Sequence, residues 1–264
     1  MTKGNFDPSL QVGEYQIPSS IRTVGSFLEI KLDNLPSESL VIFDVDETLI
    51  TPADILLKPA GRSFSGWEKI KPEQLENYLS IMLASTSYVL VDEEIPIIIQ
   101  RLSQKKISAM GLTACSTGSI GVIQSMEKWR FDQLKAVGID FSSFFTEEYV
   151  FSELVSATSS PPLFMNGILF TGDFQAADNS TKGQLFGIFL DRINWKPEQI
   201  VFIDDDMKHL EAMLKELDQR GIPFQGYLLK KPSPELDKEI AQFQIQTLLH
   251  SNKWISDNEA KKRG

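Results

Sequence analysis

Residues 40–50 read LVIFDVDETLI, in which four apolar residues are followed at once by a pair of acids. A short apolar run without alternation is typical of a strand that is buried on both faces, as in a parallel sheet. Asp44 and Asp46 are two positions apart, so in extended backbone their carboxylates project to the same side while Val45 points away. Ligands of open α/β sheets bind at the carboxyl ends of the strands. The segment therefore predicts an acid pair at a ligand-binding sheet edge.

Three further apolar runs predict buried strands of the same kind, with helical patterns between them. The predicted strands cover residues 107–112, 200–203 and 224–229. The predicted helices cover residues 120–138, residues 183–193, and a final stretch from Ser233, Pro234 and Glu235 to about residue 250. Strands that alternate with helices favour a three-layer α/β fold with helices on both faces of the sheet.

Two stretches depart from this alternation and are predicted insertions. Residues 51–95 hold another helical pattern, which we interpret as a small helical cap. Residues 161–173 carry Asn166 and Gly167 between two apolar runs, which is typical of a β-hairpin appended to the core. The predicted domains are an N-terminal segment with the first core strand (1–50), the cap (51–95), and the remaining core with the hairpin and the C-terminal helix (96–264).

The composition narrows the classes of partner. The chain has 264 residues, a formal net charge of -10 and a pI of about 4.8, so we expect no nucleic-acid partner. The single cysteine, Cys115, rules out an internal disulfide and fits a reducing compartment. The first twenty residues lack the apolar core of a secretion signal, and we expect no membrane span. These features favour a cytoplasmic protein, with export into a host cell by a dedicated secretion system as the alternative.

Four segments carry a resemblance to a known family. They are DVDET at residues 44–48, the strand that ends in Thr113, Lys182 before a helix, and Asp204 with Asp205 in IVFIDDD. In this order they resemble the four motifs of the haloacid dehalogenase (HAD) superfamily of phosphohydrolases. The stretches NGILFTGD, TKGQLFGIFL and IVFIDDD are also similar to the DUF2608 family, an uncharacterised bacterial branch of that superfamily. The resemblance implies a Rossmann-like HAD core with a cap, and a phosphohydrolase activity.

The first two acids have the chemistry that phosphoryl transfer needs. Asp44 is the predicted nucleophile, because an aspartyl-phosphate divides one hard displacement into two easier ones. Asp46 is the predicted general acid toward the leaving oxygen and then the general base toward water, with a solvated or capping carboxylate as the alternative. Thr48 is a predicted supporting residue.

A carboxylate that attacks a dianionic ester is repelled, so the chemistry predicts a bound divalent cation, and oxygen-rich clusters favour Mg2+. The predicted ligands are the carboxylates of Asp44 and Asp205 and the carbonyl of Val45. The resemblance places the direct ligand at the second acid of the pair and gives Asp204 a supporting role. Asp206 either stands just outside the metal ligands or is simply exposed.

The two remaining motifs predict contacts to the phosphoryl group. The Thr113 hydroxyl and the Ala114 backbone N–H are predicted to hold phosphoryl oxygens, and Lys182 is predicted to neutralise charge. The alternatives are a threonine chosen for its strand propensity and a solvated lysine. Many HAD members carry another acid four or five positions beyond the metal aspartate. His209 stands there in this chain and is either a support of the metal site or a surface histidine.

Other reaction classes need different residues. A cysteine phosphatase needs an Arg six positions after its cysteine, and position 121 after Cys115 is Gly. A phosphotransferase or phosphomutase would use the same aspartyl-phosphate with a hydroxyl acceptor, and the sequence does not separate this alternative from a phosphatase. A dehalogenase is disfavoured because Asp46 and Thr48 suit protonation of an ester leaving group. The alternative from another class is a non-catalytic phosphate-binding or effector module with the same fold.

The predicted partner is a phosphorylated small molecule or a phosphoprotein. A cap of about 45 residues is intermediate between an open site and an enclosing one. Arg62, Trp67 and Lys69 either contact the leaving group or belong to the surface and packing of the cap.

Overall fold

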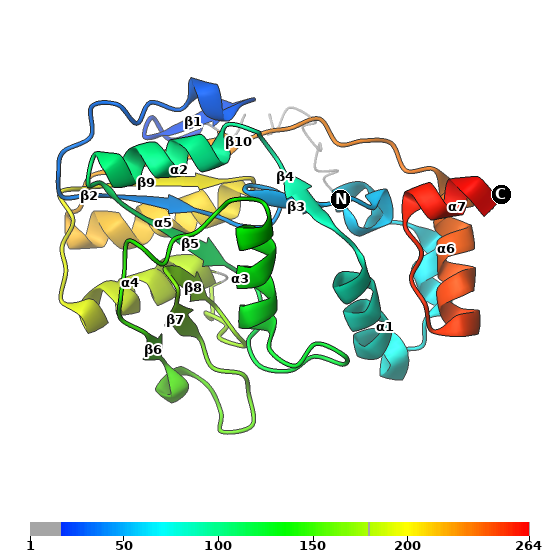
Figure 1. The fold of residues 1–264 in the computed structure, drawn as a ribbon. Helices are drawn as coiled ribbons and strands as arrows, with labels where there is room; N and C mark the ends of the chain where they lie inside the picture. The colour runs from blue at the N-terminus through cyan, green and yellow to red at the C-terminus, as the bar shows by residue number, and fades with distance from the viewer. Residues whose placement is uncertain (1–16, 179, 264) are drawn as a thin grey trace, which may run out of the picture.

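A computed structural model describes residues 17–178 and 180–263, and its centre is a sheet of eight strands (Figure 1). Residues 1–16, where we expect no secretion signal, lie outside the described part. The strand order is β1-β10-β9-β2-β5-β8-β7-β6; neighbours from β1 to β8 are parallel, and β7 and β6 are antiparallel additions. The strands are β1 (Ile21–Val24), β2 (Ser39–Phe43), β5 (Ser108–Thr113), β6 (Tyr149–Val150), β7 (Leu163–Met165), β8 (Ile168–Phe170), β9 (Gln199–Asp204) and β10 (Phe224–Leu229).

Helices cover both faces of this sheet because its inner strands are apolar on both sides. On one face, Val41 and Phe43 of β2 pack in a cluster with residues of α2 (Ile95–Gln104), α3 (Met126–Ala136) and the short helix η1 (Phe27–Glu29). On the other face, Leu40 and Ile42 pack with α4 (Thr181–Ile193) and α5 (Met207–Arg220). The three-layer, Rossmann-like α/β fold expected from the sequence is confirmed.

The predicted hairpin forms and joins the central sheet. β7 and β8 pair antiparallel around Asn166 and Gly167, which have positive φ angles of 51° and 72°. A Cβ on Gly167 would lie 2.5 Å from the Phe141 carbonyl oxygen, so glycine is needed there for both conformation and space. β8 also pairs in parallel with β5, and the hairpin therefore extends the sheet beyond its parallel core. The short helix η5 (Ser152–Leu154) follows β6.

Residues 51–95 leave the sheet after β2 and return before α2. Two short strands, β3 (Ile50–Pro52) and β4 (Tyr88–Leu90), pair antiparallel at the base of this insertion. The helical pattern predicted within this insertion forms α1 (Pro72–Ser85). Three short helices precede it, η2 (Ile55–Leu57), η3 (Pro59–Gly61) and η4 (Ser65–Lys69). The division of the chain into domains stays a prediction.

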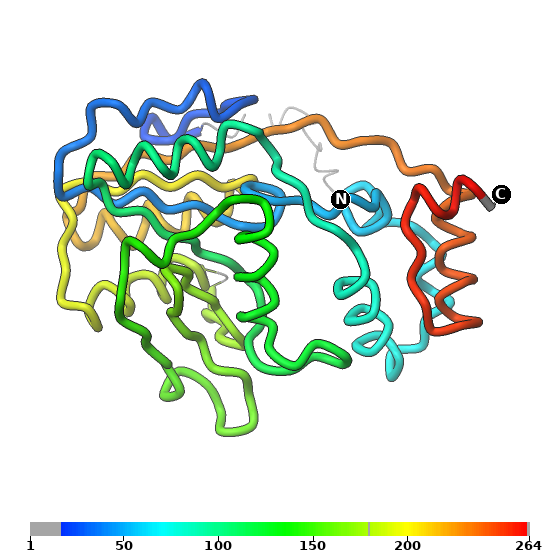
Figure 2. Tube along the Cα trace, in the orientation of Figure 1, coloured from blue at the N-terminus to red at the C-terminus, as the bar shows by residue number. Residues whose placement is uncertain are grey.

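The final helix differs from its expected place. It is α6 (Lys238–Ser251), capped by Asp237 rather than Ser233, and it is followed by α7 (Asp257–Arg263). We expected it on the core, but α6 lies beside the insertion (Figure 1), where Ile245 and Leu248 pack with Leu56 and Met82. Both sheet faces already carry helices, and the insertion alone has little apolar surface to bury. Residues 230–237, without regular structure, carry the chain from β10 to α6 (Figure 2).

A buried carboxylate joins the insertion to these last helices. Asp54 is 3% exposed and accepts a hydrogen bond from the indole Nε1 of Trp254 at 2.8 Å. It also accepts from the backbone N–H of Asp257 at 2.9 Å and from the Thr86 hydroxyl. Because a buried carboxylate is stable only when its oxygens are paired, these contacts fix the C-terminal helices on the insertion.

We expect Asp54→Ala to lower the free energy of unfolding by about 2 to 3 kcal/mol, since it leaves buried donors without an acceptor. Urea denaturation measures the loss, and hydrogen exchange should show α6 opening first. The control is Asp33→Ala, which removes an exposed ion pair with Lys105 and should cost about 0.5 kcal/mol or less. Equal losses in the two variants would contradict this account.

Candidate active site

The carboxyl ends of three adjacent parallel strands bring the predicted motif residues together. Asp44 follows β2, Thr113 ends β5 and Asp204 ends β9. β2 lies between the other two strands, and the backbone N–H of Asp44 donates to the Ile203 carbonyl with an N to O distance of 2.9 Å. The sheet register thus places acids that are far apart in the sequence at one edge.

Lys182 lies between two of these acids. Its ammonium donates to Asp44 Oδ1 at 2.5 Å and to Asp204 Oδ2 at 2.9 Å, and all three side chains are buried. The lysine is on the first turn of α4, where a Cβ on the next residue, Gly183, would lie 2.4 Å from the Ala212 carbonyl oxygen on α5. The close contact of the two helices holds Lys182 against the sheet edge.

Three carboxylates at this edge fit a divalent cation. Asp44, Asp204 and Asp205 offer oxygens that lie within 4.8 Å of one another. With the ammonium of Lys182, the ionised cluster has two negative charges in excess. A buried excess of negative charge attracts a cation, and a donor set of oxygens only suits Mg2+. In the part of the chain that the structure describes, the Asp205 carboxylate makes no hydrogen bond, which leaves both of its oxygens available.

The oxygens of Asp204 are engaged within the protein. Its Oδ1 accepts from the backbone N–H of Asp206 at 2.8 Å, and Nδ1 of His209 lies 3.0 Å from the same atom. Asp206 itself caps α5, because its carboxylate accepts from the Lys208 backbone N–H at 2.9 Å. Asp204 therefore links Lys182 to α5, and His209 contacts the acid cluster through Asp204.

The pKa values of the three acids shift according to their burial and partners. Burial, opposed by the charge of Lys182, raises the pKa of Asp44 well above its usual range. Burial also favours neutral Asp204, but Lys182 and His209 outweigh it and lower the pKa of that acid. Burial and the charge of Asp204 raise the pKa of Asp205. Protons therefore compete with a cation at Asp44 and Asp205 more strongly than at an ordinary carboxylate, and increasingly so as the pH falls.

Asp46 lies at the same edge with a partner that the sequence did not predict. Arg130 Nη2 donates to Asp46 Oδ1 at 2.6 Å, and Thr113 Oγ1 donates to Oδ2 at 3.3 Å. The Asp46 side chain is 46% exposed, whereas that of Arg130 is 5% exposed. Asp46 is thus held from the protein side and remains open to solvent on the other.

Arg130 was missed because a charged residue on a helix is usually solvated. Its guanidinium carbon lies 5.0 Å from the Tyr88 ring centroid and 4.7 Å from that of Trp129. The buried residues Met126, Arg130 and Leu134 are spaced four apart on α3. A charge within such an apolar stripe was the available signal.

Two predicted contributions of the first motif differ in the structure. The Val45 carbonyl accepts hydrogen bonds from the backbone N–H groups of Leu49 at 2.9 Å and Ile50 at 3.1 Å. Both lone pairs are used, so this carbonyl is not available as the predicted metal ligand. The Thr48 hydroxyl is fully buried and has no hydrogen-bond partner within the described residues.

The predicted phosphoryl contacts lie side by side at the end of β5. The Thr113 hydroxyl is buried and accepts from the Cys115 backbone N–H at 3.1 Å, while Ala114 is exposed. Burial raises the pKa of the Cys115 thiol to about 11, in keeping with a packed cysteine. In the cap, the Trp67 indole donates to the Gly61 carbonyl at 2.7 Å.

Glu47 is a further acid of this edge that sequence reasoning missed. Its φ of 62° lies in the left-handed region, where a glutamate is uncommon, so the sequence carries no signal for it. The Thr51 hydroxyl donates to its carboxylate at 3.0 Å, and burial together with the nearby charge of Asp205 raises its pKa. The turn at Glu47 redirects the chain from the acid pair into the insertion.

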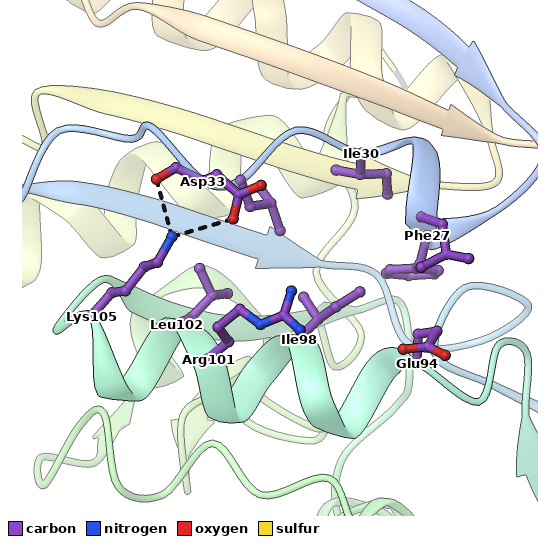
Figure 3. Close-up of a pocket in the computed structure, with 10 residues that line it drawn as sticks. Phe27, Ile30, Asp33, Glu94, Ile98, Arg101, Leu102 and Lys105 are labelled. Atoms are coloured by element: carbon purple, nitrogen blue, oxygen red, sulfur yellow. Dashed lines mark hydrogen bonds and ion pairs between the residues drawn. The ribbon is translucent and has the colours of Figure 1, made fainter.

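A separate cavity of about 140 Å³ lies between η1 and α2, away from the acids (Figure 3). Ile30, Ile98 and Leu102 form its apolar wall, and the hydrogen bonds of Lys105 to Asp33 close one end. Its lining includes none of the motif residues, so this cavity is not part of the candidate active site.

Fold and site together define a Rossmann-like α/β protein with a buried lysine and acid cluster at the carboxyl edge of its sheet. The family model described as "Protein of unknown function (DUF2608)" matches residues 19–261, and the chain belongs to that family. The resemblance to DUF2608 that the sequence predicted is confirmed.

The chain is similar to proteins of Rickettsia. An uncharacterized protein of Rickettsia prowazekii is 24% identical over 242 residues, which cover 88% of this chain and 85% of that protein. An uncharacterized protein of Rickettsia conorii is 26% identical over 197 residues, which cover 69% of this chain and 65% of that one. Among solved structures, the HAD domain of effector protein Lem4 from Legionella pneumophila, an inactive mutant, is similar at 10% identity over 85% of this chain and 97% of that chain, with a TM-score of 0.37.

Within residues 17–178 and 180–263, no helix is long and apolar enough to cross a bilayer.

We expect the stabilisation of the protein by Mg2+ to weaken as the pH is lowered from roughly 7.5 to roughly 5, because the raised pKa values of Asp44 and Asp205 let protons compete with the cation more strongly than at ordinary carboxylates. Without a cation, the contribution of these acids to stability falls as pH rises through their folded pKa values, since burial then acts on the charged form. Thermal denaturation with and without Mg2+ at both pH values measures the difference.

The variants Asp205→Asn and Asp218→Asn separate this effect from general charge. The first removes a proposed ligand and should shrink the Mg2+ shift, while the second changes an exposed acid of α5 and should preserve it. A shift of equal size at both pH values, or in both variants, would exclude these carboxylates as the binding site.

Proposed function

We propose that this protein is a Mg2+-dependent phosphatase that hydrolyses a phosphomonoester through an aspartyl-phosphate on Asp44. The observation that carries the proposal is the cluster of Asp44, Lys182, Asp204 and Asp205 at the ends of the central parallel strands. An arrangement of one buried lysine among three acids provides a nucleophile, a fixed positive charge and a cation site at the same place.

Asp44 is positioned to act as the nucleophile. One of its oxygens attacks phosphorus while the bond from phosphorus to the leaving oxygen breaks, and the second carboxylate oxygen stays near Lys182. Mg2+ held by Asp44 and Asp205 would offset the negative charge that gathers on the phosphoryl oxygens. Lys182 fixes the orientation of the Asp44 carboxylate and adds a positive charge that needs no reorganisation.

Asp46 is positioned to move the proton. As an acid it gives a proton to the leaving oxygen, and as a base it takes one from the water that attacks the aspartyl-phosphate, which frees phosphate and restores Asp44. Arg130 and Thr113 each contact a different oxygen of Asp46, so they set the direction of its carboxylate. The open side of Asp46 is where the leaving oxygen of the substrate would lie.

The remaining proposals concern the contacts to the substrate, the class of substrate and the location of the protein in the cell. The Thr113 hydroxyl and the Ala114 N–H are proposed to contact phosphoryl oxygens beside the nucleophile. A phosphorylated small molecule or phosphoprotein is the proposed substrate class, and the cytoplasm or a host cell reached by export is the proposed location.

We expect wild-type protein to hydrolyse phenyl phosphate with Mg2+ and Asp44→Asn to lose that activity, because an amide oxygen is a poor nucleophile. Phosphate release measures turnover, and chelation should abolish it. The matched control is Asp206→Asn, which changes an acid of the same run but keeps the capping chemistry of α5 and should remain active. Full activity in Asp44→Asn would rule out the covalent route, and transfer of phosphate to an added alcohol in place of water would identify a phosphotransferase.

Asp46→Asn should lower kcat by at least roughly a hundredfold, since it removes general acid and base catalysis. The loss should be smaller for 4-nitrophenyl phosphate, whose leaving group needs little protonation, than for phenyl phosphate. Equal losses on the two esters would remove the acid role from Asp46.

A further inference from the structure

A cavity of about 570 Å³ adjoins the acid cluster between the core and the insertion. Asp205 and Glu47 line it at the catalytic end, and β4, the end of β10 and the segment after β10 supply much of the rest. Three lysines, Lys58, Lys230 and Lys231, line the same cavity. Two of them follow β10 where the chain leaves the sheet for α6 (Figure 2), and Lys58 comes from the insertion.

The charges in this cavity stand out against an acidic chain with a formal net charge of -10. The Lys58 ammonium makes no hydrogen bond or ion pair within the described residues, and Lys230 donates to the Asp205 backbone carbonyl at 2.6 Å rather than to a carboxylate. Lys231 pairs with Asp92 at 3.1 Å, and its side chain is 32% exposed. Lys58 and Lys230 therefore make no ion pair with a carboxylate in the described part of the chain, and the Lys231 ammonium keeps further donors for a ligand beside its one ion pair.

The cavity has an acidic part at Asp205 and Glu47, a basic part at the three lysines, and an apolar wall. Asp205 belongs to the proposed cation site, which would hold the phosphoryl group, and Val89 and Leu90 of β4 offer apolar surface along the wall. A ligand whose phosphoryl group lies at Asp205 would extend its other end along this wall toward the lysines. A negative group there would gain favourable charge contacts, while a neutral one would not.

We propose that this cavity binds the leaving group of the substrate and that this leaving group carries a second anionic group, which Lys58 and Lys231 recognise. This inference rests on the proposed phosphatase function. It narrows the substrate class to phosphomonoesters with a second negative charge separated from the phosphate by an apolar body.

The test compares 4-carboxyphenyl phosphate with 4-carbamoylphenyl phosphate, which are nearly equal in size and differ in charge. The measured quantity is the kcat/KM value of the carboxylate ester divided by that of the amide ester. The two esters differ in leaving-group reactivity, but this difference is the same in wild type and variant, so a change in the ratio reports the charge contact alone. Lys58→Gln should lower this ratio about threefold to fivefold through KM, as expected for loss of one partly exposed charge contact. Lys58→Gln combined with Lys231→Gln should lower it about tenfold.

The control variant is Lys196→Gln, which removes an exposed lysine between α4 and β9, at the sheet edge opposite the acids, and should leave the ratio unchanged. Raising the ionic strength from about 0.05 M to about 0.5 M should lower the ratio in wild type but not in the double variant. A ratio that stays the same in the double variant, or falls equally in the control, overturns the inference while the phosphatase proposal stands.

Hydrolysis of neither ester by wild type would instead reject the phosphatase proposal. Calorimetric binding of the two esters with Mg2+ then tests the cavity by itself. Tighter binding of the carboxylate ester, lost in the double variant, supports the site, and equal binding of both esters overturns it.

Discussion

The ammonium of Lys182 is buried between Asp44 and Asp204, where loss of one partner from such a group typically costs about 3 to 5 kcal/mol. Without that positive charge, the buried carboxylates of Asp44 and Asp204, at the ends of β2 and β9, would lose the ammonium that pairs with both of them. The contact also sets the position of α4, whose first turn must approach the sheet, and Gly183 permits the close packing on α5 that this requires. The ion pairs of Lys182 thus determine both the spacing between α4 and the sheet and the charge of the candidate site.

The insertion reaches the site through an aromatic contact. Tyr88 of β4 stacks on the Arg130 guanidinium, and Arg130 in turn holds Asp46. Trp129 of α3 covers the other side of the same group. The orientation of the proposed general acid therefore depends on where β4 lies relative to α3. The insertion is a wall of the site and also a support for one of its reactive groups.

Local sequence patterns predicted the core strands and the acids that lie at their carboxyl ends. The four apolar runs became β2, β5, β9 and β10, and the motif acids and Lys182 met at one edge because parallel strands end together. The place of α6 was missed, since an amphipathic pattern does not say which apolar surface it will cover. Arg130 and Glu47 were missed because their roles arise from tertiary contacts and from a left-handed turn that leave little trace in composition. The Val45 carbonyl failed as a ligand because a tight turn had already used its lone pairs.

The apolar cluster of the insertion is assembled from two distant stretches of chain, since α6 and Trp254, which follows it, complete the cluster begun by η2 and α1. A protein shortened after β10 would retain every acid of the sheet edge and the lysine between them. It would, however, expose Leu56, Tyr78 and Met82 to water as an apolar patch that favours aggregation. The same situation arises during biosynthesis, because the insertion emerges from the ribosome long before α6, and its apolar side stays uncovered until α6 has been made.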